Sequence, residues 1–174
     1  LDSISVGSSV SNATFLNFSY NNESVASGSQ LIRKWYYRAY VNDTAGNNVS
    51  NANVTAYNVS STYQFNLTTD ATGFTPTGEI IDYINTGAAS GVNRSYYSPY
   101  TIYAKNSSYP TKSVTYNSTL NQNNYAHNIM LISASNITAC MILDGANTVY
   151  TLTQSIYTTG TCFTIQANNI TINM

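Results

Sequence analysis

Residues 31–73, LIRKWYYRAYVNDTAGNNVSNANVTAYNVSSTYQFNLTTDATG, contain three strand-like runs separated by tight turns. The first run alternates bulky or apolar side chains with polar ones, a period of two that is typical of a half-buried β-strand. Its expected inward residues are Trp35, Tyr37, Ala39 and Val41. The turn residues DTAG at 43–46 follow and predict a chain reversal.

The same alternation returns twice within this stretch. Val54 and Ala56 are the expected inward residues of the second run, and Tyr63, Phe65 and Leu67 those of the third. TDATG at 69–73 closes the third run with turn-forming residues. These runs predict about one quarter of a β-sandwich.

The rest of the chain also favours strands. Runs near 78–84, 100–105, 112–118 and 126–132 read as strands, and 85–99 reads as a long loop. No segment has helical periodicity. We therefore predict an all-β protein: an Ig-like antiparallel β-sandwich over 31–132, followed by a β-rich extension over 133–174.

Short motifs in the sandwich region resemble those of the Ig-like domains grouped as carboxypeptidase regulatory-like. They are Asn42-Asp43-x-x-Gly46, Asn51-Ala52-x-Val54-x-Ala56, Thr69-Asp70-x-x-Gly73 and Pro99-Tyr100-x-Ile102-x-Ala104. The resemblance covers roughly residues 31–132. It implies a spacer or binding module of a secreted protein, and it implies architecture more than activity.

Residues 1–30 are rich in Ser, Asn and Gly and carry apolar residues at alternate spacing. Two interpretations stay open: a first strand of the sandwich, or an extended arm that pairs elsewhere. In the second interpretation the arm is donated to a neighbouring subunit. The donated side chains would be Ile4, Val6, Val10, Leu16 and Phe18.

The last forty residues contain the two cysteines, Cys140 and Cys162, 22 positions apart. In a secreted chain one pair of cysteines indicates one disulfide, the alternative being two buried thiols. The segment resembles the first coil of a right-handed parallel β-helix, in which positions one coil apart stack closely enough for a disulfide. A single coil is not stable alone. We expect its strands to be completed by further chain or by another molecule.

Composition excludes several functions. Charged residues make up only 7%, with six Lys and Arg against seven Asp and Glu. Such a chain has no electrostatic field to attract nucleic acid or anionic lipid. It has no run of 18 apolar residues that would insert into a membrane, and no signal peptide is visible at Leu1.

Thirteen Asn-x-Ser/Thr sequons account for the unusual composition, roughly twice the number expected by chance. They begin at Asn12, Asn17, Asn22, Asn42, Asn48, Asn53, Asn58, Asn66, Asn93, Asn106, Asn117, Asn136 and Asn169. On a strand, Asn and Ser/Thr of a sequon share the outer face while the middle residue points inward. We predict N-linked glycans and an extracellular or cell-surface location. The alternative is that an Asn- and Thr-rich polar face produces sequons by accident.

Candidate chemical sites are few. The seven acids are scattered and form no glycosidase pair, and His127 is the sole histidine, with an ordinary strand position as its simplest interpretation. Asp43, Asp70 and Asp82 offer oxygen ligands for Ca²⁺, but turn chemistry already explains the first two of these positions. Tyr36-Tyr37 and Tyr96-Tyr97 would suit sugar stacking or, more simply, core and surface packing. We expect no enzyme activity, no metal and no cofactor beyond the glycans.

The expected function is that of a structural subunit of an extracellular filament (pilus- or thread-like) or surface layer. The subunits would be copies of this chain joined head to tail by strand addition. Low charge, dense sequons and abundant Asn, Thr and Tyr resemble the composition of archaeal surface and filament glycoproteins. The alternative is a monomeric Ig-like spacer or adhesion domain of a cell-surface β-helix protein that binds glycans or other cells.

Overall fold

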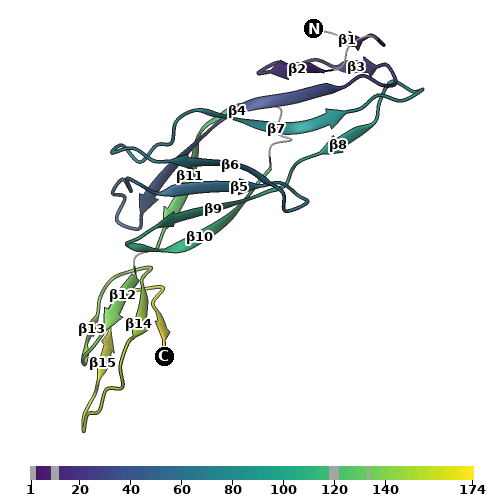
Figure 1. Cartoon of the computed structure of the whole chain (residues 1–174). Helices are drawn as coiled ribbons and strands as arrows, with labels where there is room; N and C mark the ends of the chain where they lie inside the picture. Colours follow the sequence, from purple (N-terminus) through teal and green to yellow (C-terminus); the bar gives the residue numbers. More distant parts are fainter. Residues whose placement is uncertain (1–2, 9–11, 118–121, 133) are drawn as a thin grey trace.

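The computed structural model describes residues 3–8, 12–117, 122–132 and 134–174, and these form sixteen β-strands (Figure 1). The protein is all-β, as predicted. No helix in the described residues is long and apolar enough to cross a bilayer.

The long strand β4 (Leu31–Asp43) organises the first sheet of the central body. On one edge it pairs antiparallel with β7 (Gly78–Asn85), which in turn pairs with β8 (Arg94–Tyr96). On the other edge, β11 (Asn124–Leu131) runs parallel to the second half of β4. The sheet is therefore mixed rather than fully antiparallel as expected.

The second sheet is antiparallel. Its order is β10 (Tyr109–Tyr116), β9 (Tyr100–Asn106), β5 (Asn53–Tyr57) and β6 (Tyr63–Thr68). Buried residues from both sheets form one hydrophobic core. The two sheets therefore lie face to face as in a sandwich. Whether the sandwich belongs to the Ig-like family stays a prediction.

The alternation in the sequence locates most of this core. The inward residues expected on β4 are at most 2% exposed, and Val54 and Ala56 of β5 are fully buried. Tyr63 was wrongly predicted to point inward, because its side chain is 56% exposed. A bulge between Ala56 and Tyr57 shifts the pairing with β6, so the alternation is interrupted before Tyr63.

Strand β8 lies within the segment 85–99 that we expected to be a loop. It has three residues and pairs with β7 through Tyr83, Ile84 and Asn85. The Asn85 side chain closes the turn between the two strands, since its Oδ1 accepts hydrogen bonds from the backbone N–H of Gly87 and Asn93. Three residues are too few to show an alternation in sequence.

The N-terminal segment contains three short strands: β1 (Ser3–Val6), β2 (Ala13–Leu16) and β3 (Asn22–Val25). It is thus neither the single first strand nor the unpaired arm that we expected. β1 runs parallel to β3, with Ser3 opposite Asn22, 19 positions later. β2 runs parallel to the start of β4, with Ala13 opposite Leu31, 18 positions later. These are two turns of a parallel coil, and β4 is shared between the coil and the sandwich.

The C-terminal segment is a second parallel coil with its own core of Ile137, Leu143 and Tyr150. Its strands are β12 (Ala134–Ile137), β13 (Met141–Leu143), β14 (Val149–Leu152), β15 (Phe163–Ile165) and β16 (Thr171–Asn173). Parallel pairing joins β12 to β14, β14 to β16, and β13 to β15. We expected a single coil, whereas the segment makes two turns and begins a third.

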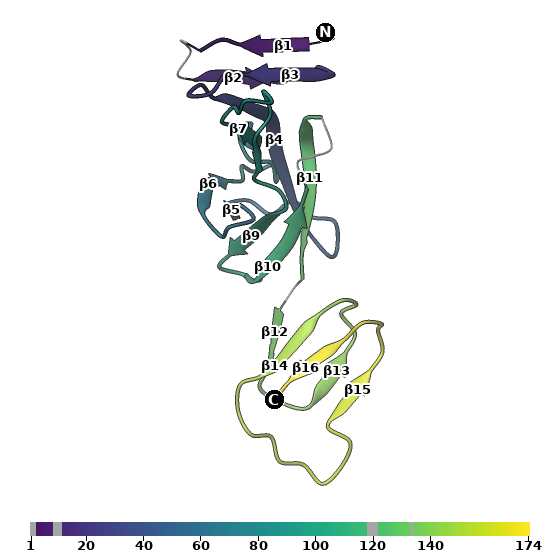
Figure 2. The same ribbon diagram turned by 90° about the vertical axis from the view of Figure 1, so that its right-hand side faces the viewer.

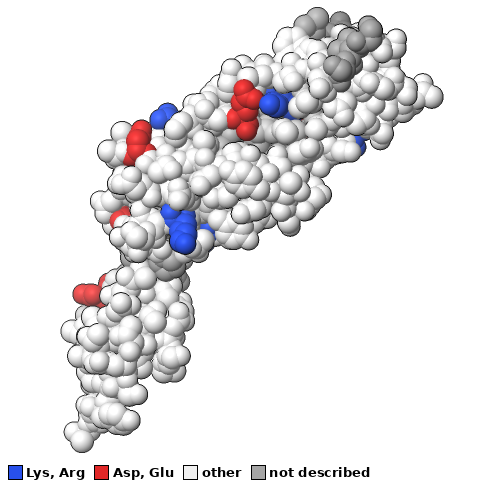
Figure 3. Space-filling model, viewed as in Figure 1, with Lys and Arg blue, Asp and Glu red and all other residues white. Residues whose placement is uncertain are grey.

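The three parts follow one another along an elongated molecule. The N-terminal coil lies at one end, the sandwich in the middle and the C-terminal coil at the other end (Figures 1 and 2). Few charged side chains interrupt the visible surface (Figure 3). The low charge content of the sequence is therefore also a property of this face.

Candidate functional site

The two ends of the molecule present similar surfaces. Among the described residues, β1 pairs with β3 alone and β2 with β4 alone. At the opposite end, β15 pairs with β13 alone and β16 with β14 alone. Each of these strands therefore has one edge of backbone donors and acceptors without a strand partner in the described chain. Both open edges belong to parallel coils.

The apolar residues expected to form a donated arm lie in the N-terminal coil instead. Val6 is buried and sits opposite Val25, while Ile4 is half-buried and sits opposite Glu23. Leu16 is half-buried on β2. Phe18 packs against Phe15, with ring centroids 5.8 Å apart. Val10 lies outside the described residues. In this structure the arm is thus paired within its own chain.

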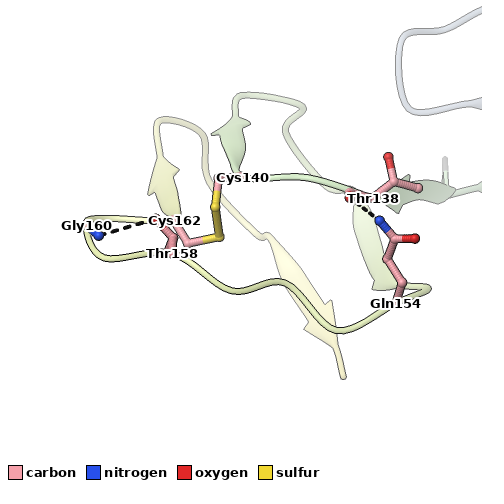
Figure 4. Close-up of a disulfide and its surroundings, with 6 residues drawn as sticks. All are labelled: Thr138, Cys140, Gln154, Thr158, Gly160 and Cys162. Carbon is pink, nitrogen blue, oxygen red and sulfur yellow. Dashed lines mark hydrogen bonds between the residues drawn. A yellow bond between two sulfur atoms is a disulfide. The ribbon is translucent and has the colours of Figure 1, made fainter.

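The predicted disulfide is present. Cys140 and Cys162 are bonded and their Cα atoms are 4.5 Å apart, on successive turns of the C-terminal coil (Figure 4). The adjacent pairing of Met141 with Phe163 explains the spacing of 22 residues, since these positions lie one turn apart. Gln154 donates from Nε2 to the carbonyl oxygen of Thr138 at 2.6 Å and links the same two turns elsewhere.

All thirteen sequon asparagines are exposed or half-exposed. The sequon pattern on strands is the expected one: Asn53 and Asn136 are exposed, whereas Val54 and Ile137 between the sequon residues are fully buried. Some of these asparagines also make contacts of their own, as Asn106 does by donating from Nδ2 to the Ser50 carbonyl oxygen. The surface is therefore sterically open to glycans. Glycosylation itself stays a prediction.

A buried polar cluster joins the N-terminal coil to the sandwich, and no motif in the sequence indicated it. Glu23 occupies an inward position of β3, where an apolar residue would be expected, and its side chain has no exposed surface. Four side chains donate to its carboxylate: Tyr20, Tyr83, Asn85 and Arg94. Arg94 Nε lies 2.6 Å from Oε1. A buried carboxylate is stable only when hydrogen bonds and an opposite charge replace its hydration, and these four donors supply both.

The pKa values in this cluster follow from these contacts. Burial acts to raise the pKa of Glu23, but the hydrogen bonds from Arg94, Tyr83 and Tyr20 hold it below its ordinary value. Burial raises the pKa of Tyr83, and the bond to Glu23 adds to that rise. Glu23 is therefore a fixed anion, and the tyrosines that surround it are neutral donors.

A second pair, Arg33 and Asp82, lies beside this cluster. Arg33 Nε is 3.7 Å from Asp82 Oδ2, and Trp35 Nε1 donates to the same oxygen at 3.3 Å. The guanidinium of Arg33 also lies over the rings of Trp35 and Tyr20, at 4.8 and 5.1 Å from their centroids. Arg33 Nε and Asp82 Oδ1 are buried without a hydrogen-bond partner among the described residues. Burial raises the pKa of Asp82.

These residues line a cavity of about 270 Å³ where β4, β7 and β8 meet the turn before β3. The lining side chains are Tyr20, Asn21, Arg33, Asp82, Tyr83, Arg94 and Tyr96. Asp82 and Arg33 are at most 8% exposed, whereas Tyr96 is 47% exposed. The cavity therefore has a buried, charged interior and an exposed aromatic residue in its wall.

The other candidates from the sequence have structural roles. Asp43 Oδ1 accepts from the backbone N–H of Ala45 and Asn47, and Asp70 Oδ1 accepts from Thr72, so both stabilise turns. His127 is half-buried, and its Nδ1 lies 2.8 Å from the Tyr37 hydroxyl. In the described residues, no three His, Cys, Asp or Glu side chains gather as metal ligands would.

The paired tyrosines also separate in the structure. Tyr37 is fully buried, and Tyr36 stacks on Tyr125 with centroids 6.1 Å apart. Tyr97 is half-buried against the core, whereas Tyr96 lies at the cavity. Of the four, Tyr96 alone lines this cavity.

No known protein-family model matches this chain, and a comparison with curated proteins finds no match either.

Proposed function

We propose that this protein is a structural subunit of an extracellular filament or surface layer, glycosylated on asparagine and extended by strand addition between copies of itself. The observation that carries the proposal is the open strand edge at each end of an elongated molecule. Parallel strands at both ends give the chain a head and a tail. Head-to-tail contacts that do not close into a ring produce filaments.

The pairing pattern defines how two copies would meet. The C-terminal coil grows outward from β12 to β16, and the N-terminal coil starts at β1 and β2. A neighbouring copy that places β1 and β2 on the open C-terminal turn would continue the same parallel coil. Half-buried Ile172 and Ile170 on one side, and half-buried Ile4 and Phe15 on the other, would become the new apolar contact.

Surface composition supports an extracellular setting. The disulfide suits an oxidising compartment, and thirteen accessible sequons suit a glycosylated surface. With charged residues at 7%, glycans would supply the hydration that charges normally provide. Nothing in this proposal requires catalysis, a metal or nucleic acid.

Two matched substitutions that each introduce a positive charge into β1 test the proposal. Ile4→Lys places a charge on the inward side of the terminal turn, a position that opposes strand addition. Ser5→Lys adds the same charge on the exposed side of the same strand. Electron microscopy and light scattering should show filaments for the unmodified protein and for Ser5→Lys, and monomers for Ile4→Lys. A folded Ile4→Lys variant that still assembles would refute strand addition at β1.

A second candidate function rests on the C-terminal coil. Parallel coils suit a spacer or adhesion domain of a cell-surface β-helix protein, in which further coils would cover the open edges. Micrographs of the native protein separate the two functions. Long filaments of regular repeat support the subunit, and separate short rods support the spacer.

A further inference from the structure

The cavity between the N-terminal coil and the sandwich contains polar groups that the fold does not satisfy. Asp82 Oδ1 and Arg33 Nε are both buried without a hydrogen-bond partner among the described residues, although Arg33 Nε lies 3.7 Å from the other carboxylate oxygen of Asp82. Buried polar atoms of this kind are costly unless something bonds to them. Both residues line the cavity. A molecule that both donates and accepts hydrogen bonds would therefore suit this cavity, once a side-chain movement brings the two buried atoms to its surface.

We propose that this cavity binds one pyranose ring of a neutral sugar. A hydroxyl group donates to a carboxylate and accepts from a guanidinium, so adjacent hydroxyls of one ring satisfy Asp82 and Arg33 together. Two guanidinium groups and one carboxylate line the cavity, and Glu23 beneath Arg94 supplies the balancing second negative charge. Because the charges cancel, the site favours a neutral ligand over a phosphate or a carboxylate.

Size and aromatic content agree with a single ring. The volume of about 270 Å³ lies just under the range of about 300–1,000 Å³ that accommodates drug-sized ligands. The faces of Tyr20 and Tyr83 are covered by the Arg33 guanidinium. The rings of Tyr96 and Tyr83 pack in a T-shaped arrangement with their centroids 5.4 Å apart. Tyr96 is the exposed aromatic residue of the lining. Its exposed surface is the aromatic surface available to the C–H side of a sugar.

Two sources supply such a ring: the glycans of another copy of this protein, and glycans of a different surface. The chemistry of recognition is the same for both. Sequons at Asn22 and Asn93 adjoin the lining residues Asn21 and Arg94 in sequence, so native and enzymatically deglycosylated protein should both be tested. The site is independent of the strand edges, and sugar binding can therefore fail while filament formation succeeds.

Saturation-transfer NMR with glucose, mannose, galactose and N-acetylglucosamine tests the proposal on the full chain. We expect saturable binding of at least one sugar to the deglycosylated protein, with a Kd of about 1 mM. Tyr96→Ala should weaken that binding at least about tenfold, because it removes the stacking face without touching the buried charges. Tyr125→Ala is the control, since Tyr125 is also exposed but stacks on Tyr36 instead.

Asp82→Asn provides a second measurement and should weaken binding by a similar factor. If Asp82→Asn does not fold, the sugar affinity of Tyr96→Ala alone tests the proposal. Binding of glycans released from the protein would identify another copy as the source, and binding of sugars foreign to those glycans would identify a different surface. The proposal is overturned if no sugar binds and the cavity holds ordered water only, or if Tyr96→Ala binds as tightly as the unmodified protein.

Discussion

Arg94 donates a hydrogen bond from Nε to Oε1 of Glu23 at 2.6 Å, although the two residues are 71 positions apart in the chain. Glu23 belongs to the N-terminal coil and Arg94 to the edge strand β8 of the sandwich. The ion pair therefore connects the two parts of the molecule. Its carboxylate is fully buried and the Arg94 side chain is 30% exposed.

Replacing Glu23 should destabilise the fold strongly. Glu23→Ala leaves Arg94 and three other donors without their acceptor, and breaking a buried pair costs about 3–5 kcal/mol. We expect the lower part of that range because Arg94 is partly solvated. Glu79→Ala is the control, since the exposed pair of Glu79 with Lys34 should contribute only about 0–1 kcal/mol. Urea denaturation measures the unfolding free energy of both variants. Equal losses of unfolding free energy in Glu23→Ala and Glu79→Ala would contradict the role assigned to Glu23.

The effect of Glu23 should depend on pH. Its pKa in the folded protein lies below the ordinary value of 4.5. A carboxylate of this kind stabilises the fold above its unfolded pKa, and this contribution is lost as the pH falls through the folded pKa. The difference in unfolding free energy between the unmodified protein and Glu23→Gln should therefore shrink at pH values below 4.5.

Asp82 acts in the opposite sense, because burial raises its pKa, and its contribution declines as the pH rises through the raised value. The negative charge of Glu23 also contributes to the raised pKa of Asp82, so the comparison is repeated with Asp82→Asn in both proteins to remove that second titration. Denaturation series from neutral to strongly acidic pH provide the measurement. A difference that stays constant over the series would show that Glu23 does not titrate as described.

The disulfide should protect the C-terminal coil more than the sandwich. Non-reducing peptide mapping should return Cys140 and Cys162 in one cross-linked species. Closing a loop of this length contributes about 3 kcal/mol, mainly by restricting the unfolded chain. After reduction, hydrogen exchange should accelerate in β12–β16 and change little in β4, β5 and β9. Equal acceleration in both regions would contradict an independent C-terminal core.

Glycans should account for a large excess of mass over the 18.9 kDa of the chain. Asn53→Gln should remove the mass of one glycan, because Asn53 is exposed and Thr55 completes its sequon. Asn147→Gln is the control, since Asn147 is followed by Thr148 and Val149 and forms no sequon. Intact-mass spectrometry of protein from its native source decides the matter. A mass equal to that of the bare chain would refute glycosylation.

The turn at Gly73 should tolerate no side chain. Gly73 has φ +76°, and an added Cβ would lie 2.6 Å from the Val41 carbonyl oxygen. Gly28 has a similar φ of +82° but open space around it. Gly28→Ala should therefore cost about 1–2 kcal/mol from the backbone conformation alone. Gly73→Ala should cost more, and thermal unfolding of the two variants tests the order.

The sequence by itself determined the all-β class and most of the sandwich core. Alternation along residues 31–43 identified Trp35, Tyr37, Ala39 and Val41 because one face of a strand is buried and the other is not. It also indicated the disulfide, since two cysteines 22 positions apart in a coil-like segment suit adjacent turns. These properties are local, or repeat at a fixed interval.

Only the tertiary structure decided what depends on distant partners. The N-terminal strands β1, β2 and β3 have four residues each, too few to show a clear alternation, and their parallel pairing joins positions 18 or 19 apart. No local pattern specifies that pairing. Glu23 and Arg33 are charged residues of types that are rarely buried, yet the coil and the sandwich bury both. Their burial is tolerable because Arg94, Tyr83 and Asp82 reach them from β7 and β8, which the chain forms some 50 or more residues later.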